Sequence, residues 1–301
     1  MRFDAFIKAL CADKTEYETN VPMSRHTTFK IGGNADAVIR PHSSDELVSV
    51  LKKAREYEVP CFIMGNGSNI LVSDDGIEGA VIDMQGISGI SVSNGEIVCG
   101  AGDSLRSVCI AARDAGLTGL EFAYGIPGTA GGALFMNAGA YGGEMKDVAV
   151  SAVCIDKNLS VCELKANEMD LGYRKSAFQK SGMIIVSVKL SLKLGKKEEI
   201  SAKMDEIFKR RAEKQPLEYP SAGSTFKRPE GNYAGTLIES SGLKGESFGG
   251  AEVSRKHAGF IVNRSNATAK DVLSLIKKVQ ATVKDKSGIE LEPEVLFVGR
   301  R

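Results

Sequence analysis

The segment from Gly125 to Gly143, GIPGTAGGALFMNAGAYGG, constrains the fold more than any other part of the chain. Seven of its nineteen residues are glycine, and no charged residue occurs between Glu121 and Glu144. Pro127, Asn137 and the glycines argue against a membrane-spanning helix, because a span exposed to lipid needs a continuous and predominantly apolar helix. Glycine permits positive φ and close approach. The segment can therefore be a backbone cradle for a polar ligand or a set of tight structural turns.

A second glycine-rich loop favours the first of these interpretations. The apolar run from Cys61 to Met64 predicts a short buried strand, and Gly65 to Asn69 follow it directly. This arrangement resembles a phosphate-binding loop after a strand. Ile70 stands where the dinucleotide fingerprint G-x-G-x-x-G requires its third glycine, and the chain holds no Walker A sequence. The two loops together indicate a less usual nucleotide-binding site.

Length and composition describe an ordinary globular protein. A chain of 301 residues predicts two or three domains, and a net charge of +1 offers no long-range attraction for nucleic acid or an acidic membrane. No signal peptide is visible at the N-terminus. Cys61, Cys99 and Cys109 lie in apolar patterns and no C-x-x-C pair occurs, which predicts reduced core cysteines in a cytoplasmic protein. The three histidines lack metal-ligand spacing, so we expect no metal site.

Hydrophobic periodicity predicts the main helices and strands. Helices are expected at 44–58 with Ser44 as cap, from Asp103 or Ser104 to Gly116, at 198–214 and at 269–284. Strands are expected at 79–84, 96–99, 148–155, 183–192 and 289–298. The inward-facing residues of the last two helices are predicted to be Ile200, Met204, Ile207 and Phe208, and then Val272, Leu275, Ile276, Val279 and Val283. A change of character near residues 195–220 indicates a domain boundary.

Three polar groups stand out against this background. Arg174 heads a basic pair in YRKSAF, Ser224 lies beside two cations in AGSTFKRP, and Glu294 is a carboxylate in the apolar segment LEPEV. Each also has a structural explanation, as a surface arginine, a helix-capping serine or a glutamate on an edge strand beside a proline. The residues alone do not decide between these readings.

The motifs taken together resemble the UDP-N-acetylenolpyruvoylglucosamine reductase family, flavoenzymes that make UDP-N-acetylmuramic acid for bacterial cell walls. Besides the three polar motifs and the long glycine segment, the resemblance rests on HTTFKIGGNAD at 26–36 and GNGSNILV at 65–72. It runs through most of the chain and points to the shorter type II form, which lacks a tyrosine-bearing loop over the substrate.

The resemblance implies an α+β fold: the FAD-binding fold of the vanillyl-alcohol oxidase/p-cresol methylhydroxylase type, with a third, substrate-binding α+β domain. The implied domains are a first FAD-binding subdomain at 1–83, a second at 84–205 plus 289–301, and a substrate-binding domain at 206–288.

The resemblance also assigns catalytic and substrate-binding residues. Hydride transfer from reduced flavin to C3 of the enolpyruvyl ether leaves negative charge at C2, which Arg174 would stabilise and Ser224 would quench with a proton. Glu294 would lie near the substrate carboxylate, so we expect it to be protonated or shielded by Arg174. The implied substrate-binding residues are Tyr173, Lys214, Lys227 and Arg228, the last at a position where the family often has asparagine.

The implied cofactors are noncovalent FAD and, as hydride donor, NADPH. The loop at 65–69 would receive the pyrophosphate through backbone N–H groups, and the segment at 125–132 would bracket the adenosine diphosphate and approach the isoalloxazine. Gly67 and Gly131 are expected to leave room for FAD. The implied FAD-binding residues are Gly65, Asn66, Gly67, Ser68, Asn69, Gly125, Ile126, Pro127, Gly128, Thr129, Gly131, Gly132 and Asn137.

The expected function is therefore NADPH-dependent reduction of UDP-N-acetylglucosamine enolpyruvate, a cytoplasmic step of peptidoglycan precursor synthesis. The expected partner is a small UDP-sugar, with no nucleic acid, membrane or obligate protein partner. Two alternatives stay open: a sugar or lactone oxidase of the same fold, and a non-catalytic UDP-sugar sensor. Many such oxidases tether flavin through histidine, and none of the three histidines lies in a glycine loop. Retention of Arg174, Ser224 and Glu294 together argues against a sensor.

Overall fold

A computed structural model describes residues 2–300, which divide into two compact units. The first unit comprises residues 2–18, 37–66 and 79–210, and the second comprises 19–36, 67–78 and 211–300. Each unit has its own hydrophobic core. Residues 289–300 belong to the second unit, and the three-domain partition expected from the sequence stays a prediction. No helix within residues 2–300 is long and apolar enough to cross a membrane.

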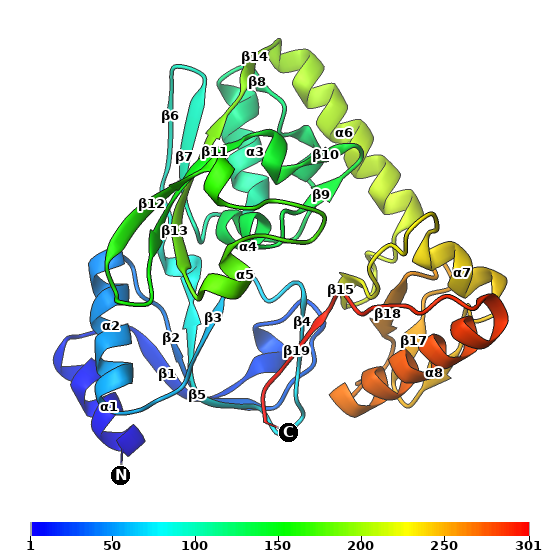
Figure 1. Cartoon of the computed structure of the whole chain (residues 1–301), viewed down its shortest axis with the longest axis horizontal. Coiled ribbons are helices and arrows are strands. Elements are labelled where there is room, and N and C mark those ends of the chain that lie inside the picture. Colours follow the sequence, from blue (N-terminus) through cyan, green and yellow to red (C-terminus); the bar gives the residue numbers. More distant parts are fainter. Residues whose placement is uncertain (1, 301) are drawn as a thin grey trace. The chain divides into compact units, whose positions relative to one another are not determined.

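The first unit is built on a five-stranded antiparallel sheet of order β12-β11-β13-β7-β6. Figure 1 shows the short helix α4 and helix α3 beside this sheet, and both contact its strands. Three of the predicted strands are confirmed here to within one or two residues. The bounds are β6 Ile90–Ser93, β7 Glu96–Gly100, α3 Leu105–Asp114, α4 Ala130–Phe135, β11 Ala149–Ile155, β12 Val161–Lys165 and β13 Ile184–Ser191.

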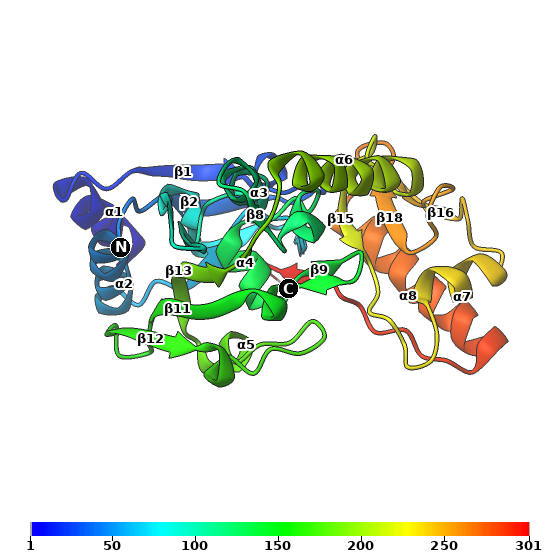
Figure 2. The same cartoon turned by 90° about the horizontal axis from the view of Figure 1, so that it is seen from above.

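Two helices of the first unit, α1 (Arg2–Ala12) and α2 (Ser44–Glu56), lie side by side, as Figures 1 and 2 both show. The side chain of Ser43 accepts a hydrogen bond from the Glu46 N–H, so the cap lies one residue before the predicted Ser44. Of the two predicted starts of α3, Asp103 and Ser104, Ser104 is the cap. This unit also contains β8 Leu117–Thr118 paired with β14 Lys193–Leu194, β9 Gly139–Ala140 paired with β10 Gly143–Glu144, and α5 Phe178–Ser181.

Helix α6 (Lys197–Lys214) passes from the first unit into the second at residue 211. Ile200, Met204 and Ile207 are buried as predicted, but Phe208 is 41% exposed, so its predicted burial is wrong. The Phe208 ring meets the edge of the Tyr124 ring at 6.1 Å between centroids. One aromatic neighbour covers only part of this ring, which explains its remaining exposure.

A second, four-stranded sheet has the order β1-β2-β5-β3. Its strands are β1 Tyr17–Pro22, β2 Asn34–Ile39, β3 Cys61–Met64 and β5 Ile77–Asp83. Strand β3 pairs in parallel with β5 and leads into the loop that begins at Gly65. Cys61 at the start of β3 is exposed, so its predicted place in the core is wrong, whereas Cys99 and Cys109 are buried.

The second unit contains an antiparallel sheet of order β15-β18-β17-β16, with α8 packed on β16 and β17 and α7 packed on α8. All five residues of the predicted apolar stripe on α8 are buried. Its strands are β15 Ser221–Ser224, β16 Ser247–Phe248, β17 Ala251–Val253 and β18 Phe260–Asn263, and its helices are α7 Ala234–Ser240 and α8 Ala269–Ser287.

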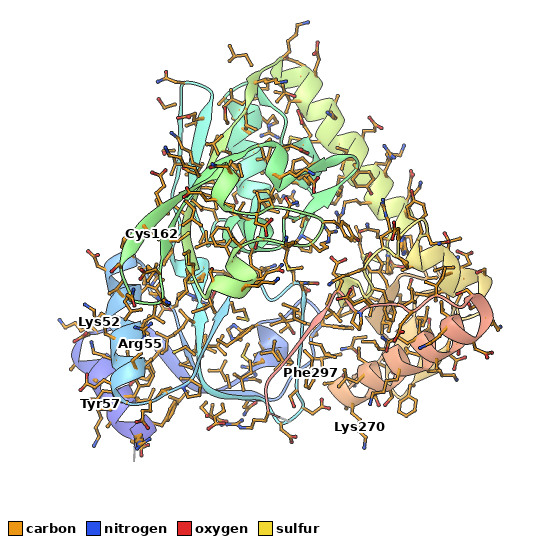
Figure 3. The ribbon with its side chains drawn as sticks, in the orientation of Figure 1. Lys52, Arg55, Tyr57, Cys162, Lys270 and Phe297 are labelled. Atoms are coloured by element: carbon orange, nitrogen blue, oxygen red, sulfur yellow. The ribbon has the colours of Figure 1, made fainter. Side chains whose placement is uncertain are left out.

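The last strand, β19 (Leu296–Val298), pairs in parallel with β4 (Ile70–Val72), and Figure 3 marks Phe297 on it. The predicted strand at 289–298 is therefore wrong for residues 289–295. Pro293 offers no N–H to a ladder. Individual hydrogen bonds hold this segment in place of a strand ladder. Gln280 Nε2 donates to the Leu291 carbonyl at 2.8 Å, and the Lys227 N–H donates to the Glu292 carbonyl at 2.9 Å.

Helix α8 begins with a fully bonded first turn. The Thr268 hydroxyl accepts from the Asp271 N–H, and the Asp271 carboxylate accepts from the Thr268 and Gly250 N–H groups. The Asp74 carboxylate accepts from the N–H groups of Ala269 and of Lys270, which Figure 3 marks at this end of the helix. The bonds from Thr268 and Gly250 hold the pKa of Asp271 below its ordinary value.

We predict that Asp271→Ala lowers the free energy of unfolding by about 1 kcal/mol at neutral pH, because α8 loses part of its cap. A depressed folded-state pKa contributes stability above the ordinary carboxyl pKa that is lost as pH falls through the folded value. The difference between variant and parent should therefore shrink below about pH 4, as denaturation at several pH values would measure. Asp285→Ala, which removes an exposed acid from the last turn of α8, is the matched control and should not destabilise. A difference that stays constant with pH would contradict the prediction.

Candidate functional site

The structure brings the two glycine loops of the sequence together within the first unit. Asn66 Nδ2 donates to the Pro127 carbonyl at 2.8 Å. A Cβ atom at Gly65 would lie 2.4 Å from Thr129 Oγ1, closer than carbon and oxygen can approach. Glycine at 65 therefore permits the contact between the end of β3 and the start of α4.

Most backbone donors of the segment at 125–132 are already used within the protein. The N–H groups of Ala130 and Gly131 donate to the carbonyls of Asp103 and Ala101 at 2.8 and 2.9 Å. The Gly132 N–H donates to the Thr129 hydroxyl, and the N–H groups of Ile126 and Gly128 donate to other carbonyls. This segment can shape a site, but it offers few N–H groups to a phosphate.

Two glycines expected to make room for FAD are required by the protein itself. A Cβ at Gly131 would lie 2.7 Å from the Ala101 Cβ, and one at Gly67 would lie 2.3 Å from the His26 carbonyl oxygen. These contacts explain the two glycines within the protein, and their role in making room for FAD stays a prediction. Gly132 differs: it is exposed, and a Cβ there would meet only Thr129 Oγ1, at 3.3 Å. Gly132 is the bare position of α4.

The loop at 67–69, in the second unit, has the donors that the other loop lacks. Among residues 2–300, no hydrogen bond is donated by the backbone N–H groups of Gly67, Ser68 or Asn69. Gly67 is left-handed, with φ +59°. Successive unbonded N–H groups beside a left-handed residue are typical of an anion-binding nest. The chemistry of this loop fits a phosphate group.

Arg174 lies at the corner of a tight turn in the first unit. The N–H of Gly172 donates to the Lys175 carbonyl at 3.0 Å, and the reverse bond measures 3.1 Å. Arg174 has φ +51°, which the third position of a type II turn requires and which non-glycine residues rarely adopt. Its guanidinium lies 5.3 Å from the ring centroid of Tyr173, and Nη2 is 3.5 Å from the Gly139 carbonyl.

Side chains that sequence reasoning did not single out attach this turn to α4. Ser176 Oγ donates to the Phe135 carbonyl at 2.6 Å, and Gln179 Nε2 donates to the same oxygen and to the Arg174 carbonyl. Asn137, implied as an FAD-binding residue, is completely buried with its amide bonded to Glu144 and Gly172. No local sequence signal identifies these contacts, because their partners lie far along the chain.

Ser224 and Glu294 come close together in the second unit. Ser224 ends β15, after an irregular pairing with β18 in which Gly223 has φ +77°. It is exposed, and within residues 2–300 its hydroxyl makes no hydrogen bond. The Glu294 N–H donates to the carbonyl of Thr225, the residue after Ser224, at 2.8 Å. Asn69 Nδ2 donates to the Glu294 carbonyl at 3.2 Å. Hydrogen bonds thus link the 67–69 loop to Glu294, and Glu294 to the residue that follows Ser224.

The basic residues implied for substrate binding have different surroundings. Lys227 Nζ lies 2.5 Å from a carboxylate oxygen of Glu292, so its charge is partly neutralised. The Arg228 guanidinium lies 4.6 Å from the ring centroid of Tyr233. Lys214 is exposed at the end of α6. Tyr173 and Arg174 belong to the first unit, and these three basic residues belong to the second.

Two other side chains of reactive types, His257 and Cys99, have pKa values that are shifted by burial. Burial lowers the pKa of His257, whose Nδ1 accepts from the Gly259 N–H at 3.1 Å. Burial raises the pKa of Cys99 to about 12, so its thiol stays protonated. In the part of the chain that the structure describes, no three His, Cys, Asp or Glu side chains group in a way that could hold a metal ion.

Comparison with known proteins identifies two domains in the chain. Residues 35–164 match an FAD binding domain, and residues 215–298 match the domain described as UDP-N-acetylenolpyruvoylglucosamine reductase, C-terminal domain. These matches confirm the predicted α+β fold with an FAD-binding domain and identify an FAD-dependent oxidoreductase.

Full-length similarity agrees with the domain matches. The UDP-N-acetylenolpyruvoylglucosamine reductase of Caldanaerobacter subterraneus is 51% identical, over 94% of this chain and 93% of its own. That of Staphylococcus aureus (strain Newman) is 49% identical, over 92% and 91%. The crystal structure of the Thermus caldophilus reductase, MurB, superposes with a TM-score of 0.81 at 36% identity, over 94% of this chain and 98% of that one. The chain belongs to the UDP-N-acetylenolpyruvoylglucosamine reductase family.

Proposed function

We propose that this protein reduces UDP-N-acetylglucosamine enolpyruvate to UDP-N-acetylmuramate with NADPH, in the cytoplasm, as a step of peptidoglycan precursor synthesis. The net reaction adds a hydride and a proton across one C=C bond and oxidises NADPH to NADP⁺. The observation that supports it most is the exposed hydroxyl of Ser224, which has no hydrogen-bond partner within residues 2–300 and lies one residue from the backbone contact with Glu294. A hydroxyl left free of protein partners is available to give its proton to a substrate.

The residues present fit FAD, which supplies hydride transfer in this reaction. The N–H groups of Gly67, Ser68 and Asn69 would hold the pyrophosphate, because they have no protein acceptor among residues 2–300. Gly132 would lie against a flat part of the cofactor, since its exposed face carries no side chain. Asn66 and Thr129 would act by fixing the two loops to each other. The other implied positions, Gly65, Gly125, Ile126, Pro127, Gly128 and Gly131, would shape the site through their backbone.

Arg174 would stabilise the negative charge that develops on the substrate when the hydride arrives. A guanidinium is permanently charged and presents parallel donors that match a carboxylate. Backbone strain at functional positions persists only where the surroundings hold it, and the φ of Arg174 is such a case. Its turn is bonded on both sides, so the guanidinium starts from a fixed backbone.

Ser224 would deliver the proton to C2 of the substrate, and Glu294 would lie at the substrate carboxylate. A serine hydroxyl is a weak acid, but the carbanionic centre is a far stronger base. The pairing of β15 with β18 shifts register between Ser221 and Ser224, and Ser224 lies opposite Phe260 where the pairing resumes. Irregularities of this kind are over-represented beside active sites. Tyr173, Lys214, Lys227 and Arg228 would contact the UDP-sugar, with Lys227 weakened for this task by Glu292.

A spectrum taken without oxygen tests the proposed function as a whole. We expect purified protein to be yellow, to be bleached by NADPH, and to recover its colour quickly with UDP-N-acetylglucosamine enolpyruvate and slowly with oxygen. Fast recolouring by oxygen alone would favour an oxidase. Binding of the UDP-sugar without recolouring would favour a sensor.

The bare position of α4 gives a prediction about cofactor content. Gly132→Val should leave the protein folded but largely without FAD, because its side chain enters the space proposed for cofactor atoms, and Gly132→Ala should lose less. Gly131→Ala is the contrasting neighbour, since its Cβ would strike Ala101 and should lower thermal stability instead. Flavin absorbance per folded protein measures the first effect. Full FAD content in Gly132→Val would refute the placement.

The forked donor of Arg174 gives a prediction about one half of the reaction. Arg174→Lys keeps the charge and the backbone requirement but loses the fork. Reoxidation of prereduced enzyme by the enolpyruvyl substrate should slow by about 10²–10³-fold, the usual effect of removing one such stabilising donor. Reduction of the flavin by NADPH should change little. An equal loss in both halves would assign Arg174 to binding or folding.

The free hydroxyl of Ser224 gives a prediction about proton transfer. In Ser224→Ala, reoxidation by substrate should slow by about 10²–10⁴-fold, the range of general acid catalysis, while NADPH still reduces the flavin. Ser224→Cys, which keeps a proton at nearly the same place, should recover part of the rate. Stopped-flow absorbance separates the two halves. If Ser224→Ala reoxidises as fast as the parent, Ser224 is only a turn residue.

A further inference from the structure

Asn137 has no contact with solvent, although it lies in the glycine-rich segment expected to face the cofactor. Its backbone has φ +40°, a left-handed conformation that asparagine tolerates better than most residues. A buried amide must have its hydrogen bonds satisfied, since an unpaired polar group away from water is destabilising. The partners of this amide therefore define what the residue does.

The Asn137 amide joins its own segment to two others of the first unit, residues 144–146 and Gly172. Its Nδ2 donates to Glu144 Oε2 at 2.8 Å and to the Gly172 carbonyl at 2.9 Å. Its Oδ1 accepts from the Lys146 N–H at 2.9 Å. Both N–H bonds of the amide group and its oxygen are used by protein atoms.

The bond to Gly172 matters because Gly172 is the first residue of the turn that carries Arg174. Within residues 2–300, the Asn137 amide is the side-chain donor to this carbonyl, and the turn's own two bonds join Gly172 to Lys175. The far side of the turn is held separately, by Ser176 and Gln179 on the Phe135 carbonyl. Asn137 and Phe135 thus hold the two ends of the turn from the end of α4.

We propose that Asn137 is a positioning residue for Arg174 and not a cofactor ligand. This inference rests on the catalytic role proposed for Arg174. The left-handed conformation of Arg174 is sparsely populated, so the turn needs bonds at both ends to keep it. Without the bond at Gly172, the guanidinium can shift, and a misplacement of about 1 Å can cost 10²-fold in rate.

Asn137→Asp tests the bond with little change in shape. Aspartate keeps an oxygen for the Lys146 N–H and tolerates the left-handed backbone, but it cannot donate to Gly172 or Glu144. Reoxidation of prereduced enzyme by the enolpyruvyl substrate should slow by about 10–10²-fold. FAD content and flavin reduction by NADPH should stay near parental values. Asn158→Asp, the same change at an exposed turn of the first unit, is the matched control and should have no effect.

A double variant covers the case in which Asn137→Asp fails to fold. In Asn137→Asp with Glu144→Gln, the glutamine amide can donate to the aspartate, so the link between 137 and 144 is restored with reversed polarity. The link to Gly172 stays broken. The double variant should therefore fold and still show slow reoxidation, and parental reoxidation by the double variant would overturn the proposal. Loss of FAD from a folded variant would also overturn it, since that result makes Asn137 part of the cofactor site.

A double-mutant cycle with Arg174→Ala separates a positioning role from a general structural one. If Asn137 acts through Arg174, adding Asn137→Asp to Arg174→Ala should slow reoxidation by less than about twofold more. Full multiplication of the two effects, with Arg174→Ala itself slow, would overturn the positioning role alone. A parental rate in Arg174→Ala would instead overturn the catalytic role of Arg174 and with it the proposed mechanism.

Discussion

The close approach of Gly131 to Ala101 is the contact on which the site of the first unit depends. Helix α4 has six residues, too few for a helix that is stable on its own in water. Its position is fixed by bonds from Ala130 and Gly131 to carbonyls of the 101–103 segment and by the bond from the Leu105 N–H to the Gly128 carbonyl. Only a missing side chain at Gly131 lets these bonds form. The Phe135 carbonyl and Asn137, which hold the Arg174 turn, follow directly from where α4 lies.

The glycines near this site accordingly have two structural roles. Gly65, Gly67 and Gly131 let one part of the backbone approach another, while Gly132 leaves a surface open. The two loops also differ in their hydrogen-bond donors. Within residues 2–300, the N–H groups at 67–69 donate no hydrogen bond, whereas most of those at 126–132 donate to other protein atoms. A ligand with a charged centre and a flat ring system suits this division better than a simple anion does.

Sequence reasoning recovered what is local or repeated and lost what is set by distant partners. The stripe on α8 and the cap at Ser104 follow from spacing and side-chain chemistry, and both are present. The family motifs indicated the candidate residues, because short motifs in a fixed order are specific together. Helix α4 was not expected, since two glycines lower helix propensity and only the tertiary bonds of its first turn overcome this.

The failures at single residues have the same origin. Cys61 and Phe208 fit apolar patterns, but spacing does not tell whether a neighbouring element covers them, and both are exposed. Asn137 bonds to a carbonyl 35 residues away, which no local pattern encodes. Residues 289–295 were expected to form a strand, but individual hydrogen bonds around Pro293 hold them instead. Alternating hydrophobicity cannot distinguish this arrangement from a strand ladder.

The parallel pairing of β4 with β19 bears on how the chain matures during synthesis. Asn69 bonds to Glu294, 225 residues further along, and Leu296 lies opposite Ile70. Long-range parallel pairings form late, because a large loop must close before they form. The 67–69 loop can therefore form its hydrogen bonds with residues 294–296 only after these residues have been synthesised. The nucleotide binding that we propose for this loop should therefore follow translation of that segment, and ribosome-bound chains truncated before residue 294 are expected to lack it.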